Sequence, residues 1–532
     1  MESETERERK MEEYLRSKGF FEEEKEATER ERVLGILNNL ANKFISRVAH
    51  QHRIPINSNS LSKIFTYGSY RLGVHSSGAD IDTLCVVPNF ITRNDFFTIF
   101  YDDLAQEKSI TGLSKVTNTF VPLIKFKIHS IPIDLVFARL DIPSIPSNID
   151  LLDNKFLKHM DEKCILSLNG NRVTDEILNV VPSTKTFHRA LRFIKYWAQS
   201  RHLYGHAYGY MGGVAYALCI ARICQMFPGI DAFETVGRFF SAFAKWQWPQ
   251  PVVIKEVPDC NFNLKVWNPK TNLAHRNDKM PVITPVYPSI CSTHNVSVST
   301  LTVMKRDFTR CASICEQVAA KTVEIDEGLD ALCAPTDFFT RHKNYFAVAV
   351  AADNSAEFAK FMGFAETKVR ILASKLENIE NIAFAYVFPK TYTTTSTPAT
   401  NYLLRTMECS GESYAFGVIF IGIEFSSNKL PINASRKMNL SRPVSEFKTL
   451  LEAYEHDEEC AISYEVFPLK QKLLTDILAL FNEDLPTTTT TPTTPTPTTP
   501  TTTTTPTSTT TTTTTPTPTP KKRKIREEIR KK

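Results

Sequence analysis

The sequence of 532 residues contains no run of about 18 consecutive apolar residues, the length that a membrane-spanning helix needs. Its first residues, MESETERERKMEEY, are charged and lack an apolar core, so we expect no secretory signal. The 11 cysteines include no Cys-x-x-Cys pair and are scattered along the chain. These absences argue against a membrane protein and a disulfide framework. We expect all 11 cysteines to be reduced thiols in the core of an intracellular protein.

A general excess of positive charge is also missing. The chain has 63 Lys and Arg against 58 Asp and Glu, a formal charge of +5. Residues 521–532 contain eight Lys or Arg and two Glu, a net +6, which leaves 5 − 6 = −1 for the other 520 residues. A globally basic surface is therefore excluded, and a site for a polyanion must come from local placement of charge. With 42% apolar and 23% charged residues, the composition is that of a globular protein.

Hydrophobic periodicity predicts three folded parts. Residues 1–50 predict helix, with an apolar stripe at three- and four-residue steps, and residues 61–140 predict strands with intervening helix. Residues 183–340 predict mainly helix. Residues 343–480 predict strands at NYFAVAVAA and AFGVIFIGIEF, with a long amphipathic helix between them. The stripe in the first helix consists of Val33, Ile36, Leu37, Leu40 and Phe44.

Three aspartates form the most informative pattern. Asp80 and Asp82 stand two residues apart in a strand pattern, so their side chains point to the same face. Asp134 lies on another strand, IPIDLVF, among apolar residues where a lone charge is costly. Clustered carboxylates repel one another unless a cation lies between them. The three side chains therefore predict a hard-oxygen site for Mg²⁺ or Mn²⁺.

A Gly-Ser turn precedes the first aspartate by about eleven residues. Gly68 lets backbone N–H groups approach a phosphate closely, and Ser69 adds a hydroxyl donor. Metal-binding carboxylates beside a phosphate cradle suit nucleotidyl transfer, in which one metal activates a hydroxyl and the other stabilises the leaving pyrophosphate. A lone Gly-Ser is usually only a turn, and a lone Asp-x-Asp is usually a solvated pair. Their combination with a third aspartate favours a functional site.

These residues resemble a known family. FTYGSYRLGVHSSGADIDTLCVVP resembles the active-site signature of the eukaryotic nuclear poly(A) polymerases, members of the DNA polymerase β-like nucleotidyltransferase superfamily. Further segments resemble the family in family order, strongly over residues 20–310 and weakly over 335–480. They are IDLVFARL, SLNGNRVTDEIL, RALRFIKYWAQSRHLYG, GYMGGVAYALCIARICQMFP, FAKWQWPQPV and MPVITPVYPSICSTHNVSVST.

The resemblance implies a multidomain α/β and α+β protein. A nucleotidyltransferase mixed-sheet catalytic domain with an N-terminal helix is expected at 1–181, followed by a helical central domain at 182–337. An RNA-binding domain, an RNA-recognition-like C-terminal α+β unit, is expected at 338–485. Because it lacks a convincing aromatic RNP signature, we expect it to contact the RNA backbone rather than read bases stringently. Residues 486–520 contain only Thr, Pro and one Ser and predict a disordered linker, with a basic tail at 521–532.

The resemblance also implies roles for individual residues. Asp80, Asp82 and Asp134 are the implied catalytic residues and metal ligands. Phe120 is implied to lie near the RNA 3′ end. The implied ATP-binding residues are Tyr67, Gly68, Ser69 and Ser76 at the triphosphate, Lys195 and Tyr204 at the phosphates, Asn169 at the ribose, and Gly213, Val214 and Thr300 at the adenine.

We therefore expect a template-independent RNA adenylyltransferase. It would add AMP from ATP to the 3′ end of pre-mRNA by a two-metal-ion mechanism with Mg²⁺ or Mn²⁺, releasing pyrophosphate. One alternative is a related terminal nucleotidyltransferase with another NTP preference, which incorporation of the four NTPs would distinguish. Another is an inactive RNA-binding scaffold, against which the intact carboxylate triad argues.

The basic tail suggests where the protein acts. The run KKRK at 521–524 resembles a nuclear localisation signal, placed after a flexible spacer where an import receptor could reach it. We expect a nuclear protein whose partners are ATP, an RNA 3′ end, cleavage and polyadenylation factors and a nuclear import receptor, with no membrane.

Overall fold

The computed structural model describes residues 5–55, 62–117, 119–426, 440–455 and 460–483. The predicted linker at 486–520 and basic tail at 521–532 lie outside the described residues. No helix in the described ranges is long and apolar enough to cross a membrane.

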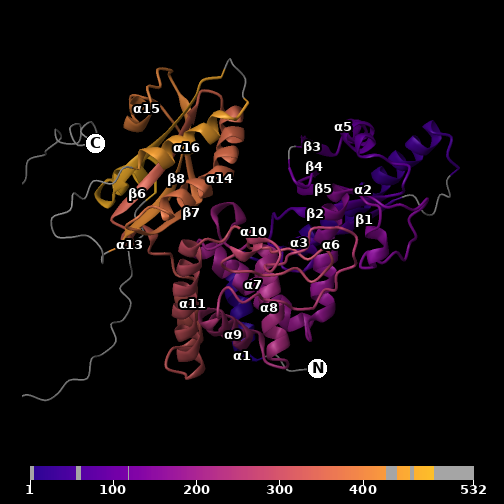
Figure 1. Cartoon of the computed structure of the whole chain (residues 1–532), viewed down its shortest axis with the longest axis horizontal. Helices are drawn as coiled ribbons and strands as arrows, with labels where there is room; N and C mark the ends of the chain where they lie inside the picture. Colours follow the sequence, from indigo (N-terminus) through magenta and orange to yellow (C-terminus); the bar gives the residue numbers. More distant parts are fainter. Residues whose placement is uncertain (1–4, 56–61, 118, 427–439, 456–459, 484–532) are drawn as a thin grey trace, which may run out of the picture. The chain divides into compact units, whose positions relative to one another are not determined.

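The first sheet is a mixed sheet of five strands, in purple shades in Figure 1, with the order β1-β2-β5-β4-β3. Strands β2 and β5 pair in parallel, whereas the other neighbours are antiparallel. This confirms the mixed α/β unit that the alternating pattern predicts. The strands are β1 (Lys63–Thr66), β2 (Ile81–Val87), β3 (Ile110–Val116), β4 (Leu123–Ile128) and β5 (Ile131–Arg139).

Helices pack on this sheet through apolar stripes. Helix α2 (Glu24–Gln51) contacts β1 and β5, and helix α6 (Glu162–Val180) contacts β5 and β2. Of the predicted stripe on α2, Val33, Leu37, Leu40 and Phe44 are buried, and Ile36 is half-buried. The smaller elements around the sheet are α3 (Gly68–Arg71), α4 (Arg93–Asp95), a π-helical turn (Phe96–Phe100), α5 (Tyr101–Gln106) and a 3-10 turn (Asn154–Leu157).

The sequence predicts helix throughout residues 1–50, but the structure has two helices there, α1 and α2. Helix α1 (Glu6–Ser17) ends before Gly19, which adopts a positive φ of 68°. The N–H of Gly19 donates to the carbonyl of Arg16, and that of Phe20 donates to Leu15, which closes the helix end in the manner of a Schellman motif. Helix α1 then packs against α7, α9 and α12 of the helical part.

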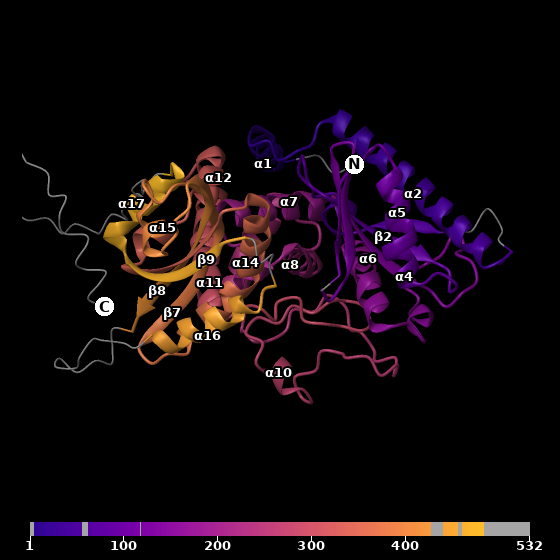
Figure 2. The ribbon, with the colours of Figure 1, turned by 90° about the horizontal axis from the view of Figure 1, so that it is seen from above.

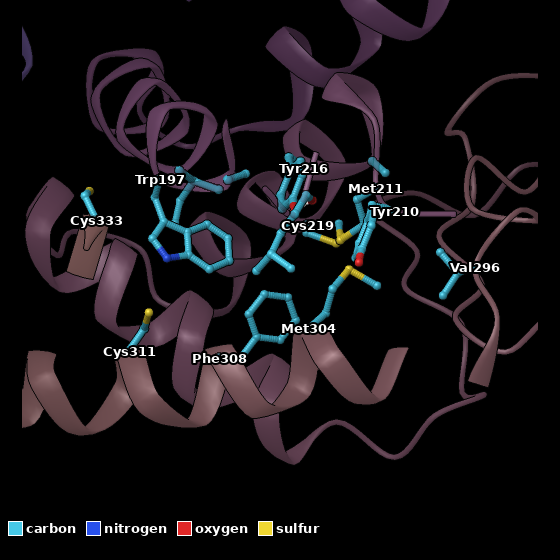
Figure 3. Packing of buried hydrophobic residues seen from close by; sticks show 14 of the residues in the cluster. Trp197, Tyr210, Met211, Tyr216, Cys219, Val296, Met304, Phe308, Cys311 and Cys333 are labelled. Carbon is cyan, nitrogen blue, oxygen red and sulfur yellow. Dashed lines mark hydrogen bonds between the residues drawn. The ribbon is translucent and has the colours of Figure 1, made fainter. Parts of the chain in front are cut away.

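The helical part has an aromatic core. Trp197 of α7 lies against Tyr216 of α8, Phe240 of α9 and Phe308 of α11. Figure 3 labels Trp197, Tyr216 and Phe308 in this core. Each is fully buried, so the core holds the helices through apolar contact area. The helices are α7 (Thr184–Ser200), α8 (Gly213–Met226), α9 (Ala232–Lys245), α11 (Val298–Ala319) and α12 (Ile325–Cys333), with a 3-10 turn at His206–Tyr208.

The prediction of a mainly helical segment at 183–340 is confirmed, although residues 246–297 within it are irregular. Within this stretch only α10 (Leu273–Arg276) is helical, and Figure 2 shows the chain around α10 as irregular ribbon. The stretch contains seven prolines, each of which removes a backbone donor and fixes φ, so a continuous helix cannot form.

The C-terminal part is a four-stranded antiparallel sheet with the order β7-β8-β6-β9. The two predicted strands and the helix between them are confirmed as β6, β8 and α14. The strands are β6 (Asn344–Ala352), β7 (Ile382–Ser396), β8 (Tyr414–Phe425) and β9 (Ile462–Lys470). The helices are α13 (Phe338–Arg341), α14 (Ser355–Glu377), α15 (Tyr402–Thr406), α16 (Ser441–Glu452) and α17 (Leu474–Leu478), with 3-10 turns at Gln471–Leu473 and Ala479–Phe481.

Both faces of this sheet are covered. Phe346, Val348 and Val350 of β6 point into a core shared with α14 and α16, which lie together in Figure 2. The alternate residues of β6, Tyr345 and Ala347 among them, belong to a second core shared with α13, α15 and α17. No open sheet face is therefore left within the described residues for bases to stack on in the manner of an RNA-recognition module.

All 11 cysteines lie within the described residues and are free thiols there. Nine are buried, as expected from their apolar neighbours. Cys260 and Cys460 are partly exposed, so the expectation of core thiols is wrong for these two.

Candidate active site

Three carboxylates converge where β2 and β5 run side by side. Asp82 and Asp134 are direct partners in the parallel register, and Asp80 stands one residue before β2. A carboxylate oxygen of each lies within 4.8 Å of the others, so the structure brings together the three aspartates that the sequence singled out. Hard oxygen donors at this spacing suit Mg²⁺ or Mn²⁺, and the residues present therefore fit a divalent cation.

The three carboxylates repel one another. Burial, together with Asp80 and Asp134, raises the pKa of the Asp82 carboxyl to about 7. Lys125 and Lys195 act in the opposite direction. Lys125 on β4 is the register partner of Asp134, and its Nζ lies 2.6 Å from Asp134 Oδ2. Sequence reasoning missed Lys125, because only the strand register places it beside the aspartates.

The Gly-Ser turn lies directly beside Asp82. Gly68 has a φ of +63°, and a Cβ at this position would stand 2.2 Å from Asp82 Oδ2. Only glycine fits both the backbone angle and the space. Ser69 follows in the first turn of α3, and Tyr67 donates its backbone N–H to the carbonyl of Asp82.

Helix α6 supports this turn from the other side. The Thr174 hydroxyl accepts from the N–H of Gly68 at 3.3 Å, and Asn171 Nδ2 donates to the carbonyl of Thr66 at 3.1 Å. The Tyr67 ring packs where Gly170 lacks a side chain, since a Cβ there would stand 2.8 Å from the ring. Burial, and then the three aspartates, raise the pKa of the Tyr67 hydroxyl.

Lys195 and Tyr204 reach the same charges from the helical part. The Lys195 ammonium donates to the carbonyl of Val74 at 3.3 Å. Burial lowers its pKa, and the nearby Asp80 and Asp82 raise it. Burial, followed by Asp82 and Asp80, raises the pKa of the Tyr204 hydroxyl. Both side chains therefore lie near the carboxylates, where a triphosphate would need donors.

Tyr204 also meets the start of α8. A Cβ on Gly213 would stand 2.8 Å from the Tyr204 hydroxyl, so glycine makes this contact possible. Val214 follows in the first turn of α8 and is 42% exposed, which is high for a large apolar side chain and leaves it available to a flat ligand.

Asn169 on α6 is buried with only 6% of its surface exposed. Neither its Nδ2 nor its Oδ1 has a hydrogen-bond partner among the described residues. Buried amides are nearly always satisfied, so this pair of free groups points to a ligand.

The remaining predicted residues are Ser76, Thr300 and Phe120, and the structure gives none of them a contact with the three aspartates among the described residues. Ser76 is half-buried in the loop before Asp80, and its carbonyl accepts from the N–H of Ala79. The Thr300 hydroxyl takes part in the N-terminal capping box of α11 with Ser297, so it is engaged within its own helix. Phe120 lies between β3 and β4 and is 89% exposed.

Three convergent carboxylates and a glycine turn on a mixed sheet, with Lys195 and Tyr204 nearby, are the arrangement expected of a metal-dependent nucleotidyltransferase. Comparison with known families narrows this class. Three family models match in succession: the poly(A) polymerase nucleotidyltransferase domain at 1–181, the poly(A) polymerase central domain at 186–329 and the poly(A) polymerase predicted RNA binding domain at 337–415.

Curated relatives agree with these models. Poly(A) polymerase pla1 of Schizosaccharomyces pombe is 41% identical over 379 residues, which are 71% of this chain and 66% of that protein. Poly(A) polymerase PAPa of Candida albicans is 42% identical over 381 residues, which are 71% of this chain and 68% of that protein. The chain belongs to the poly(A) polymerase family and is a polynucleotide adenylyltransferase that adds poly(A) to RNA. The matched region spans about two thirds of the length of these relatives.

Among solved structures, the Cid1 poly(U) polymerase with bound MgGTP matches at a TM-score of 0.42 and 13% identity, over 62% of this chain and 99% of that one. A Cid1 structure described for RNA terminal uridylyl transferase activity matches at a TM-score of 0.41 and 13% identity, over 63% and 99%.

Proposed function

We propose that the chain extends the 3′ end of pre-mRNA with AMP from ATP by a two-metal-ion mechanism that releases pyrophosphate. The observation that carries this proposal is the convergence of Asp80, Asp82 and Asp134 within 4.8 Å. When bound, two Mg²⁺ or Mn²⁺ ions would activate the RNA 3′-hydroxyl and offset the charge that develops on the leaving group.

The chain's own residues orient the reactants. Asp80, Asp82 and Asp134 would hold the ions. Lys195 would leave the Val74 carbonyl and donate to the triphosphate as a point charge, with Tyr204 donating its hydroxyl beside it. Tyr67, Gly68, Ser69 and Ser76 would line the triphosphate from the turn and the loop that precedes Asp80.

Adenine and ribose would be selected without a template base. The Asn169 amide would bond the ribose, because it is buried and has no other hydrogen-bond partner among the described residues. Gly213 and Val214 would present an apolar surface to the base, and Thr300 would contribute to the same adenine site. Phe120, exposed between β3 and β4, would stack on the RNA end.

The experiment is extension of a labelled RNA primer with each of the four NTPs, with and without Mg²⁺. ATP should be the preferred donor, and chelation should stop extension. Asp134→Ala should lower the rate by at least about a hundredfold, since loss of a metal ligand removes several kcal/mol of transition-state stabilisation. Its fold should persist, as judged by circular dichroism.

Asp141→Asn, at an exposed aspartate after β5, is the matched control and should extend normally. Equal use of all four NTPs would instead favour the alternative, a related terminal nucleotidyltransferase with another NTP preference. Extension by Asp134→Ala at the wild-type rate would contradict the site assignment.

The cellular setting is also a proposal. The KKRK run at 521–524 supports recognition by a nuclear import receptor and hence a nuclear protein. Cleavage and polyadenylation factors would deliver the RNA. Replacing residues 521–524 with alanine should abolish nuclear accumulation of a fluorescently tagged chain, while primer extension by the purified protein stays unchanged.

A further inference from the structure

Three charged residues stand four residues apart in the sequence: Glu22, just before α2, and Glu26 and Arg30, in its first two turns. Glu26 and Arg30 share one face of the helix, and with Glu22 they form what we call the α2 charge cluster. The Arg30 side chain is fully buried. Its Nε donates to Glu22 Oε2 at 2.9 Å, and its Nη2 donates to Glu26 Oε1 at 2.8 Å.

The α2 charge cluster forms hydrogen bonds to the loop of residues 75–79. Arg30 Nη2 donates to the carbonyl of Ala79 at 2.7 Å. Glu26 accepts from the Ser77 hydroxyl at 2.7 Å and from the N–H of Gly78 at 2.8 Å. Glu22 Oε1 lies 2.6 Å from His75 Nε2. Four of the five loop residues therefore contact α2 or Glu22, which precedes it.

The loop leads directly into Asp80, which lies between Ala79 and Ile81, the first paired residue of β2. Asp82 and Asp134 stand within strands, where the ladder with the neighbouring strand fixes their backbone. Asp80 lies outside β2 and is exposed, so no ladder pair of the sheet includes it. The sheet fixes Ile81 on one side of Asp80, and the Arg30 contact to the Ala79 carbonyl fixes the backbone on the other side.

Side chains of α7 hold the other end of the same segment. Arg192 Nη2 donates to the carbonyl of Gly73, and Lys195 Nζ donates to that of Val74. The proposed role of Lys195 at the triphosphate would require it to leave Val74. The grip of α2 on residues 75–79 involves no side chain assigned to ATP or metal, and it can persist when the site fills.

We infer that the α2 charge cluster positions Asp80 for metal binding, so that Glu26 and Arg30 are positioning residues for the reaction. This inference rests on the proposed metal-dependent function. A buried ion pair adds little net stability, because desolvation offsets the attraction, but it holds its groups in one geometry. The geometry held here is that of the backbone beside Asp80.

The test is direct titration of the full chain with Mn²⁺, in which the free ion is followed by electron paramagnetic resonance, at a temperature where each variant is folded. Glu26→Ala should weaken Mn²⁺ binding by about tenfold or more, the loss typical of residues that orient a metal ligand. Its primer extension should need correspondingly more Mg²⁺. Glu26→Gln should bind nearly as wild type, because the amide oxygen can still accept from Gly78 and Arg30.

Arg201→Met is the matched control. Arg201 is another buried arginine, bonded to Asp307 and to backbone carbonyls of residues 334 and 335, and none of these printed bonds reaches residues 75–79. This variant should lose stability but keep wild-type Mn²⁺ affinity. Ser77→Ala removes one bond at an exposed position, so it should fold and bind Mn²⁺ more weakly than wild type by a smaller factor.

The outcomes separate the two proposals. Wild-type Mn²⁺ affinity in folded Glu26→Ala would overturn the inference, provided that Asp134→Ala weakens binding. If Asp134→Ala also binds as wild type, the proposed metal site itself is wrong. Equal weakening in Glu26→Ala and Arg201→Met would overturn the inference as well, since it would reveal a general effect of lost stability.

Discussion

At the scale of single residues, Asn169 separates a binding role from a structural one. Its amide is buried without a partner among the described residues, which costs about 1–3 kcal/mol in the folded protein. Asn169→Leu should therefore leave the free energy of unfolding unchanged or raise it by about 1 kcal/mol. The KM for ATP should rise at least about tenfold because the proposed ribose contact is lost. Urea unfolding and primer extension measure the two quantities.

Asn171, two residues further along α6, provides the contrast. Its Nδ2 donates to the carbonyl of Thr66, so Asn171→Leu should lower stability by roughly 1–3 kcal/mol. Lower stability in Asn169→Leu with an unchanged KM would show that Asn169 is structural.

Gly68 is where backbone angle and catalytic geometry meet. In Gly68→Ala the new Cβ would stand 2.2 Å from Asp82 Oδ2, so the carboxylate must move out of the cluster. The rate of AMP addition should fall by about a hundredfold or more, because a small displacement of a catalytic group lowers the rate by about this factor. Initial rates and melting temperature should be measured together.

Gly112→Ala controls for the backbone strain. Gly112 has a φ of +64°, nearly that of Gly68, yet nothing lies within 4 Å of its Cβ position. Both variants should lose about 1 kcal/mol of stability, and only Gly68→Ala should lose activity. Comparable activity in the two variants would contradict the role given to Asp82.

At the scale of elements, His342 joins α13 to the C-terminal sheet. Its Nε2 lies 2.5 Å from the Tyr386 hydroxyl on β7, and it is buried. Burial, with the nearby Arg341, lowers its pKa to about 4. The unfolded chain binds a proton at a pKa near 6.5, so between these values the unfolded state holds more protons. Stability from this group is complete above about pH 6.5 and is lost as the pH falls to about 4.

The expected loss is up to about 3 kcal/mol across this range. His342→Gln keeps a donor or acceptor for Tyr386 but does not titrate, so its free energy of unfolding should fall less between pH 7 and pH 4.5. Chemical denaturation of both proteins at several pH values measures the difference. Parallel curves would show that His342 does not contribute.

The elements also show what sequence patterns predict well. Long periodic segments such as α7, α14, β6 and β8 were predicted because their apolar spacing is local. The break at Gly19 and the irregular stretch 246–297 were not identified. One glycine and dispersed prolines interrupt segments whose apolar residues otherwise have helical spacing. Strands β7 and β9 were not identified: β7 contains Pro389 and a register shift, and its second half is rich in threonine.

The candidate site divides in the same way. Asp80, Asp82, Asp134 and Gly68 could be found because residue type and spacing carry their chemistry. Lys125 and the α2 charge cluster could not, because their positions depend on strand register and on helix packing. The run FEEEKEATERER predicts a solvated charged face, and nothing in its spacing shows that Arg30 is buried and bonded to the loop of residues 75–79.

At the scale of the whole molecule, charge is placed locally rather than spread. Outside residues 521–532 the chain has a net charge of −1, so nucleotide and RNA cannot be held by a general basic surface. The cations near the carboxylates are Lys125 and Lys195. Lys125 and Lys195 carry two positive charges against three aspartates and a triphosphate, so we expect a bound divalent metal to supply further positive charge.

This balance predicts that metal stabilises the whole fold. An ion that binds only the folded state adds about 2.7 kcal/mol at one hundred times its Kd. Mn²⁺ should therefore raise the melting temperature, and a chelator should reverse the rise. Asp82→Asn removes one of three clustered charges, one that is half-buried, so the metal-free variant should melt above the metal-free wild type.

The same variant loses a metal ligand, so added Mn²⁺ should no longer raise its melting temperature. Scanning calorimetry of both proteins at pH 8, with and without Mn²⁺, measures the four values. Asp141→Asn leaves the cluster intact and should reproduce both wild-type values. A Mn²⁺-induced rise of the same size in Asp82→Asn would mean that the ion stabilises the protein at another place, and that the three carboxylates coexist without needing it.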